Sequence, residues 1–272
     1  MEILDLSENK IRNIDILEKV NFKQLNSLYL SQNEISDINV LEKVKFEELK
    51  ILDLGFNNIS DIEVLENVKF EKLETLHLSG NTITEFKVLE NVNFENLKML
   101  NLSSCKISNI NFLEKTNFQN LSILFLTDNE IIDINVLEYT KFEKIEKLKL
   151  NWNKIPDINI LERVHFPCLN TLDLSDNKIS DINILEKVNF PCLNTWDMSD
   201  NKISDINILE NVKFEELQSL DLSNNQIVDI NVFLKVKFYQ LEELNLLNNK
   251  IDENKCLITI NMLKSKIHYF DV

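Results

Sequence analysis

The chain has 272 residues and a formal net charge of −16, with 44% hydrophobic residues but only two glycines and three prolines. A surface this acidic repels phosphate groups, which argues against nucleic acid and anionic lipid as partners. The sequence has no apolar run of about 18 residues, and its first residues have neither a basic start nor an apolar core. We therefore expect no membrane insertion, no signal peptide and a cytoplasmic location.

The sequence repeats every 24 residues without insertion or deletion. Repeat position 4 is Leu in ten of eleven blocks and Trp196 in the other, position 6 is Leu except at Met198, and position 11 is always Ile. A fixed period of this length is typical of a solenoid, in which each repeat forms one coil and buries its apolar face against the next. The blocks begin at Met1, Leu25, Leu49, Leu73, Leu97, Leu121, Ile145, Leu169, Leu193, Leu217 and Leu241.

The first half of each repeat predicts a short strand. Apolar positions 4 and 6 alternate with polar positions 3, 5 and 7, which is the period of a half-buried strand. Position 9 is Asn in ten blocks, and an inward-facing Asn can bond backbone groups of its own coil and of the next. We therefore expect an asparagine ladder. Cys105 takes this position in one block, where it is expected to be a small buried residue with a weak donor.

The second half of each repeat predicts a short 3₁₀ or helical turn. Apolar residues recur at positions 14, 17 and 20, and the Asp that is common at position 13 is suited to capping the turn. Position 22 is Phe in all ten blocks that reach it, from Phe22 to Phe238. This strict repetition predicts a stacked spine of rings in the core, with roughly 1.5–3 kcal/mol of burial for each ring.

The first eleven positions, L-x-x-L-x-L-S-x-N-x-I, resemble the defining segment of leucine-rich repeats. The run NKISDINILEKV at Asn177–Val188 is similar to repeats of the bacterial internalin type and of the eukaryotic phosphatase-regulator type. Both types usually have shorter repeats, by two residues, than this chain. The resemblance implies an α/β fold: a curved, right-handed solenoid with a parallel β-sheet on its concave face and 3₁₀ or helical turns on its convex face. We expect repeats over residues 1–257 and a degenerate closing segment over 258–272, with a last strand within Lys266–Val272.

Exposed positions of the concave face are where the repeat is least constrained, so departures there indicate function. The middle repeats carry aromatic and cationic residues at positions 5 and 8, a composition typical of interaction hot spots. We predict that a partner protein binds this surface. The predicted contact residues are Tyr29, Phe56, His77, Phe125, Lys149 and Trp152. The alternative is random drift of an unconstrained surface.

Later repeats carry an acidic strip that includes Asp173, Asp197 and Asp221. The strip is either a second site for a basic partner or the product of recent repeat duplication. We expect a solvated surface there rather than a Ca²⁺ site. Cys168 and Cys192 share one repeat position and are expected to be free thiols.

The sequence contains no phosphate-binding loop, metal-spaced histidine pair or nucleophile motif. We therefore expect no enzyme activity, no cofactor, no metal and no small-molecule substrate. The predicted function is that of a protein–protein interaction scaffold. A secreted or surface adhesin or effector of the internalin type is the alternative, together with a surface location if this sequence is a fragment. A structural protein that assembles through its repeat ends is a further possibility.

Overall fold

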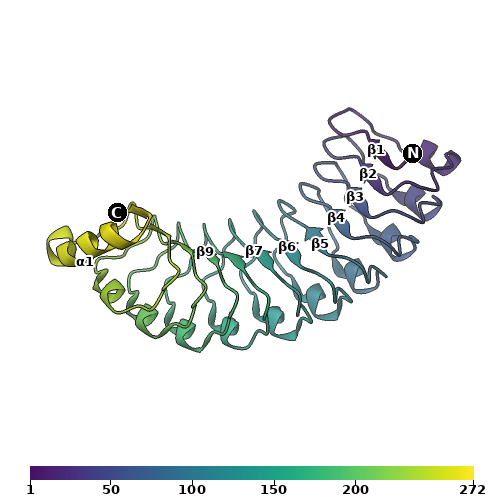
Figure 1. The fold of residues 1–272 in the computed structure, drawn as a ribbon. Helices are drawn as coiled ribbons and strands as arrows, with labels where there is room; N and C mark the ends of the chain where they lie inside the picture. The colour runs from purple at the N-terminus through teal and green to yellow at the C-terminus, as the bar shows by residue number, and fades with distance from the viewer. The chain divides into compact units, whose positions relative to one another are not determined.

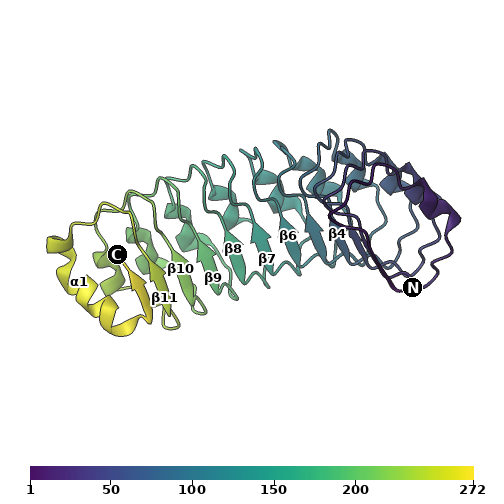
Figure 2. The ribbon, with the colours of Figure 1, turned by 90° about the horizontal axis from the view of Figure 1, so that it is seen from above.

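The computed structural model describes residues 1–272, which form two compact units. Unit 1 comprises Met1–Asn129 with Tyr139–Phe142, and unit 2 comprises Glu130–Glu138 with Glu143–Val272. In both units each repeat forms one coil, and its strand lies beside the strand of the neighbouring coil, as Figures 1 and 2 show for β2 to β5 and for β8 to β11. All strand pairs are parallel and follow sequence order.

Each strand has three residues. Unit 1 contains β1 (Ile3–Asp5), β2 (Ser27–Tyr29), β3 (Ile51–Asp53), β4 (Thr75–His77), β5 (Met99–Asn101) and β6 (Ile123–Phe125). Unit 2 contains β7 (Lys147–Lys149), β8 (Thr171–Asp173), β9 (Thr195–Asp197), β10 (Ser219–Asp221), β11 (Glu243–Asn245) and β12 (Tyr269–Asp271). The predicted parallel sheet of short strands is thus confirmed in each unit.

The second half of each repeat forms a 3₁₀ turn, as predicted. The turns of unit 1 are η1 (Asp15–Lys19), η2 (Asn39–Glu42), η3 (Glu63–Glu66), η4 (Lys87–Glu90) and η5 (Asn111–Lys115). Those of unit 2 are η7 (Asn159–Glu162), η8 (Asn183–Lys187), η9 (Asn207–Asn211) and η10 (Asn231–Leu234), and η6 (Asn135–Tyr139) carries residues of both units. The Asp at position 13 accepts the N–H of position 15, for example Asn39 N–H to Asp37 at 2.8 Å. The residue that directly precedes the turn is the Ile of position 14, so Asp acts one residue earlier than an ordinary N-cap.

The core is the repeated apolar set. The Leu side chains of positions 4 and 6 are almost fully buried from the second repeat onward, and the Ile of position 11 is buried from the second repeat to the tenth. The Phe rings of position 22 are buried as predicted from Phe46 to Phe238, whereas Phe22 in the first repeat is half-buried. Phe190 stacks on Phe166 and on Phe214 with centroids 6.4 Å apart. Trp196 packs edge-on against Phe214.

The asparagine ladder is confirmed. Asn33 donates to the carbonyls of Leu6 in the preceding coil and of Leu30 in its own coil, at 2.9 and 3.1 Å. Its Oδ1 accepts the Ile11 N–H at 2.9 Å. Cys105 is buried at the ladder position, and its thiol donates weakly to the carbonyl of Leu78. Burial raises the pKa of this thiol.

Unit 2 ends in the helix α1 (Glu253–Lys266) and then β12. Asp252 caps α1 by accepting the Lys255 N–H, and the inner face of α1 packs against η10 (Figure 2). β12 is the last strand that the sequence predicted within Lys266–Val272. α1 crosses the boundary that the sequence suggested between residues 257 and 258, because its N-cap already stands at Asp252.

Candidate protein-binding face

The side chains of repeat position 5 form one row along the strand-lined face of unit 1. The register places Tyr29 beside Asp53, Asp53 beside His77, His77 beside Asn101, and Asn101 beside Phe125. Neighbouring strands lie about 4.8 Å apart, so Tyr29 lies about 10 Å from His77, and His77 lies about 10 Å from Phe125. Tyr29, His77 and Phe125 therefore share one row, but a polar residue stands between neighbouring rings.

Position 5 has a structural preference that the sequence reading did not identify. Where the residue is Asp or Asn, its Oδ1 accepts the backbone N–H of position 7, as in Ser199 N–H to Asp197 at 2.9 Å. The seven residues that make this bond are Asp5, Asp53, Asn101, Asp173, Asp197, Asp221 and Asn245. The other four residues at position 5 are Tyr29, His77, Phe125 and Lys149, which have no carboxylate or amide oxygen for it. All four were predicted as contact residues.

Position 8 has a second preference, which is conformational. Its residue has a φ between +51° and +65° in all eleven repeats, the left-handed region that suits Gly, Asn and Asp. Six of the eleven residues are of these types, whereas Phe56 and Trp152 are bulky aromatics for which this conformation is strained. Both rings are nevertheless exposed, by 57% and 60%. Strained, exposed aromatic residues are candidates for function.

The two glycines of the chain both lie beside Phe56. A Cβ at Gly80 would lie 2.5 Å from Cδ1 of Phe56, so the ring covers the backbone of Gly80. A Cβ at Gly55 would lie 3.1 Å from the Ser79 hydroxyl and 3.2 Å from the Asp53 carboxylate. The position of the Phe56 ring in unit 1 thus depends on a residue without a side chain in the next repeat.

In unit 2 the position-5 row is mainly acidic. Lys149 stands at its start and its Nζ lies 3.7 Å from Asp173 Oδ2. Asp173, Asp197 and Asp221 follow in register, and each accepts both the N–H and the hydroxyl of the Ser two residues later. Burial raises the pKa of Asp197, against the opposing effect of its Ser199 bonds, and the neighbouring carboxylates raise it further. These aspartates therefore stabilise their own turns, whatever else they bind.

The position-8 side chains of unit 2 form a polar ladder beside this row. Asn224 donates to Asp200 at 3.1 Å, and Asn248 donates to Asn224 at 2.8 Å. The pKa of Asp176 is raised, first by burial and then by the carboxylates of Asp200 and Asp173. The exposed ring of Trp152 is the one aromatic side chain at position 8 in this unit.

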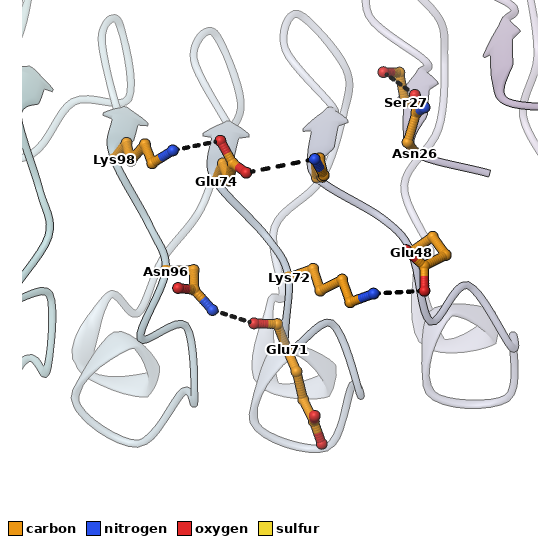
Figure 3. Close-up of polar contacts among 9 residues, drawn as sticks. Asn26, Ser27, Glu48, Glu71, Lys72, Glu74, Asn96 and Lys98 are labelled. Carbon is orange, nitrogen blue, oxygen red and sulfur yellow. Dashed lines mark hydrogen bonds and ion pairs between the residues drawn. The ribbon is translucent and has the colours of Figure 1, made fainter. Parts of the chain in front are cut away.

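A row of charges at position 2 borders the strand-lined face of unit 1 and was missed by the sequence reading. Glu74 lies between two lysines, with Lys98 Nζ at 2.8 Å and Lys50 Nζ at 3.8 Å (Figure 3). Lys72 pairs with Glu48 in the same view. The hydrogen bond from Lys98 holds the pKa of Glu74 below its ordinary value. The sequence does contain a signal for this row, because the charge at position 2 alternates from Lys50 to Glu74 to Lys98 in successive repeats. The alternation leaves this border of the face nearly neutral.

The structure places the six predicted contact residues in two groups. Tyr29, Phe56, His77 and Phe125 belong to unit 1, and Lys149 and Trp152 belong to unit 2. His77 lies 3.5 Å from the Asn101 amide, and Lys149 lies beside Asp173. The first group offers an aromatic surface interrupted by Asp53 and Asn101, and the second offers an indole and an ammonium group next to carboxylates.

The described chain contains no group of three or more His, Cys, Asp or Glu side chains that could hold a metal ion. Cys168 and Cys192 are exposed thiols, whereas Cys105 and Cys256 are buried thiols. No helix is both long and apolar enough to cross a bilayer.

Comparison with known families gives matches over parts of the chain. The family model described as Leucine Rich repeats (2 copies) matches residues 47–91, and two further leucine-rich-repeat models match residues 166–182 with 191–206 and residues 216–235. A search of curated proteins finds no significant match.

Solved structures share the fold. The internalin InlF of Listeria monocytogenes is 26% identical with a TM-score of 0.77, over 92% of this chain and 68% of its own. A leucine-rich-repeat protein of Leptospira interrogans is 21% identical with a TM-score of 0.81, over 100% of this chain and 72% of its own, which shows the fold alone. A TLR13–ssRNA13 complex is 25% identical with a TM-score of 0.70, over 91% of this chain but only 36% of TLR13.

Proposed function

Because this chain is a leucine-rich-repeat protein that resembles the internalin type, we propose that it binds another protein through its strand-lined face. Proteins of this fold are generally non-enzymatic scaffolds for protein–protein interaction. The proposed contact residues are Tyr29, Phe56, His77 and Phe125 in unit 1 and Lys149 and Trp152 in unit 2.

One observation carries the proposal. Each of the six residues occupies a position at which the local backbone favours Asp, Asn or Gly, and each gives up that stabilisation. The lost side-chain bond at position 5 is worth about 0.5–1.5 kcal/mol, and the left-handed conformation costs a bulky residue about 1–2 kcal/mol. Drift on a solvated surface would not concentrate aromatic and cationic residues at the costliest positions, whereas contact with a partner accounts for them.

Protein is the proposed partner class, rather than nucleic acid. The net charge of −16 repels a phosphate backbone, and Asp53, Asp173 and Asp197 lie on the proposed face itself. The TLR13 complex with RNA is a structural neighbour, so the fold by itself decides nothing on this point. A direct check is filter binding of single-stranded RNA, for which we expect no retention at physiological salt.

The test is capture from the native source with variants that restore the repeat consensus. One variant changes Tyr29, Phe56, His77 and Phe125 to Asn, a second changes Lys149 and Trp152 to Asn, and a control changes Tyr139 to Lys. Tyr139 is an exposed aromatic on a 3₁₀ turn, at a position where Lys is common. We expect proteins retained by the wild type and the control to be lost from at least one consensus variant. Equal retention by all four chains would refute the proposed face.

A second candidate function, that of a surface or secreted adhesin, is favoured by the similarity to internalin InlF. The cytoplasmic alternative is supported by two exposed free thiols, Cys168 and Cys192, since exposed thiols are uncommon in oxidising compartments. Immunoblotting of cytosol, surface and medium fractions of the native cells distinguishes the two. We expect the chain in the cytosol, and its presence in the surface or medium fraction would favour the adhesin.

A further inference from the structure

The tenth repeat departs from the consensus on its 3₁₀ side. Position 18 is Glu in the nine preceding repeats, where it commonly pairs with a cation of the next coil, as Glu162 does with Lys187. In the tenth repeat it is Leu234, and position 23, commonly Glu, is Tyr239. Both side chains are exposed, by 50% and 78%. Two charged positions have thus become exposed apolar positions in one repeat.

Tyr239 lines a groove of about 400 Å³ between the end of the tenth repeat and α1. All lining residues except Lys266 have apolar or aromatic side chains, among them Phe233, Val236, Phe238, Met262 and Ile267. We refer to it as the cap groove. The floor is firmly held, because Phe233 and Phe238 are buried and Leu263 of α1 packs beside them.

The outer surface of α1 is mainly polar but carries two exposed apolar side chains. Cys256, Thr259, Ile260 and Leu263 form its buried face, whereas Leu257 and Ile258 on other sides of the helix are exposed by 56% and 76%. Leu234, Tyr239, Leu257 and Ile258 are thus four exposed apolar side chains in the C-terminal part of unit 2.

The charge around the cap groove is the reverse of the charge of the whole chain. The segments 231–241 and 254–270 contain no Asp or Glu, but they contain five lysines. Lys235 pairs with Glu210 at 2.9 Å and Lys255 pairs with Asp252 at 3.4 Å, so the basic rim consists of Lys237, Lys264 and Lys266. Lys266 lines the groove itself. In contrast, a groove on the 3₁₀ side of unit 1 is lined by Glu42, Glu63, Glu66 and Glu85. The lysines thus give the cap groove a basic rim, although the whole chain has a net charge of −16.

We propose that the cap groove binds an acidic amphipathic peptide segment of a partner protein, at a site separate from the strand-lined face. Apolar side chains of the segment enter the groove, and its carboxylates face the lysines of the rim, which is the helix-in-groove mode of recognition. A peptide fits better than an anionic membrane for two reasons. The site is concave, so it receives side chains rather than inserting them, and the net charge of the chain opposes approach to an anionic surface.

The test uses a fluorescein-labelled synthetic helix with Leu at i, i+3, i+4 and i+7 and Glu elsewhere, and its counterpart with Lys in place of Glu. One protein variant combines Leu234→Glu with Tyr239→Glu, which restores the repeat consensus, and a second combines Lys237→Glu with Lys266→Glu. The control, Ile132→Ser, removes an exposed apolar side chain at a position where Ser is common. Far-UV circular dichroism checks that each variant is folded.

We expect saturable anisotropy changes with the acidic helix, at least about tenfold weaker binding by both double variants, and unchanged binding by the control. Binding by the wild type should weaken as salt is raised from about 0.05 to 0.5 M, because the lysines are exposed. Equal binding of the acidic and basic helices, or unchanged binding by the consensus-restoring variant, would overturn the proposal. So would cosedimentation with phosphatidylserine vesicles without peptide binding, or self-association that the same variant abolishes.

Discussion

Gly80→Ala measures how Phe56 is held in unit 1. The added Cβ would lie 2.5 Å from Cδ1 of Phe56, closer than two such carbon atoms can approach. Gly80 also has a φ of +65°, a conformation that costs alanine about 1–2 kcal/mol. Displacing the ring adds about 1 kcal/mol or more. We expect the substitution to lower the free energy of unfolding by about 2–3 kcal/mol.

A double-mutant cycle with Phe56→Ala separates the two contributions. Without the ring only the conformational cost remains, so Gly80→Ala should then cost about 1–2 kcal/mol and the coupling energy should be about 1 kcal/mol. Urea unfolding followed by far-UV circular dichroism provides the values. Ser104→Ala is the matched control, because Ser104 already has a Cβ at the same repeat position with a φ of +55°. An equal cost of Gly80→Ala with and without the ring would show that Phe56 does not cover Gly80.

Three further predictions concern stability. Cys105→Asn should raise the free energy of unfolding by about 1 kcal/mol, because it restores the ladder donor to the Leu78 carbonyl. Asn129→Ala should lower it by about 3 kcal/mol, because Asn129 bonds five backbone groups. Urea midpoints check both, and a change of the opposite sign contradicts the ladder. Asp197→Asn should stabilise the fold at pH 7 but not near pH 3. Burial raises the folded-state pKa of Asp197, so its ionised form opposes folding above that pKa, and protonation at low pH removes the difference. An equal gain at both pH values would contradict this. Glu74→Gln should change stability by less than about 1 kcal/mol, since its pairs with Lys98 and Lys50 are on the surface, and a larger loss in the same assay would show a structural role.

The elements that follow the 24-residue period could be predicted from the sequence. Leu28 in β2, Asn33 in the ladder and Phe46 in the spine recur in identical surroundings, so one repeat explains the others. The strand β12 was predicted within Lys266–Val272, but it lies outside the 24-residue phase, because Tyr269 pairs with Glu243 at an offset of 26 residues. α1 was not recognised, because the departure from the repeat after Asp252 was interpreted only as a degenerate closing segment.

The contact residues could be chosen from the sequence, but the reason for their selection could not be seen there. Tyr29 and Lys149 depart from the consensus in any alignment of the repeats, yet only the backbone shows that Asp or Asn would bond the N–H two residues later. Similarly, the amino-acid sequence does not show that the backbone of Phe56 and of Trp152 adopts a left-handed conformation. The division into two units was also not predictable, since the period continues unbroken through residues 130–142.

The most direct test of the central claim is a calorimetric titration with a purified partner captured by the wild-type chain. The partner is titrated into the wild type, the two consensus-restoring variants of the strand-lined face, and Tyr139→Lys. The account predicts that at least one consensus variant binds about a hundredfold more weakly, equivalent to about 2.7 kcal/mol, while Tyr139→Lys binds as the wild type does. Dissociation constants that agree for all four chains would contradict the account.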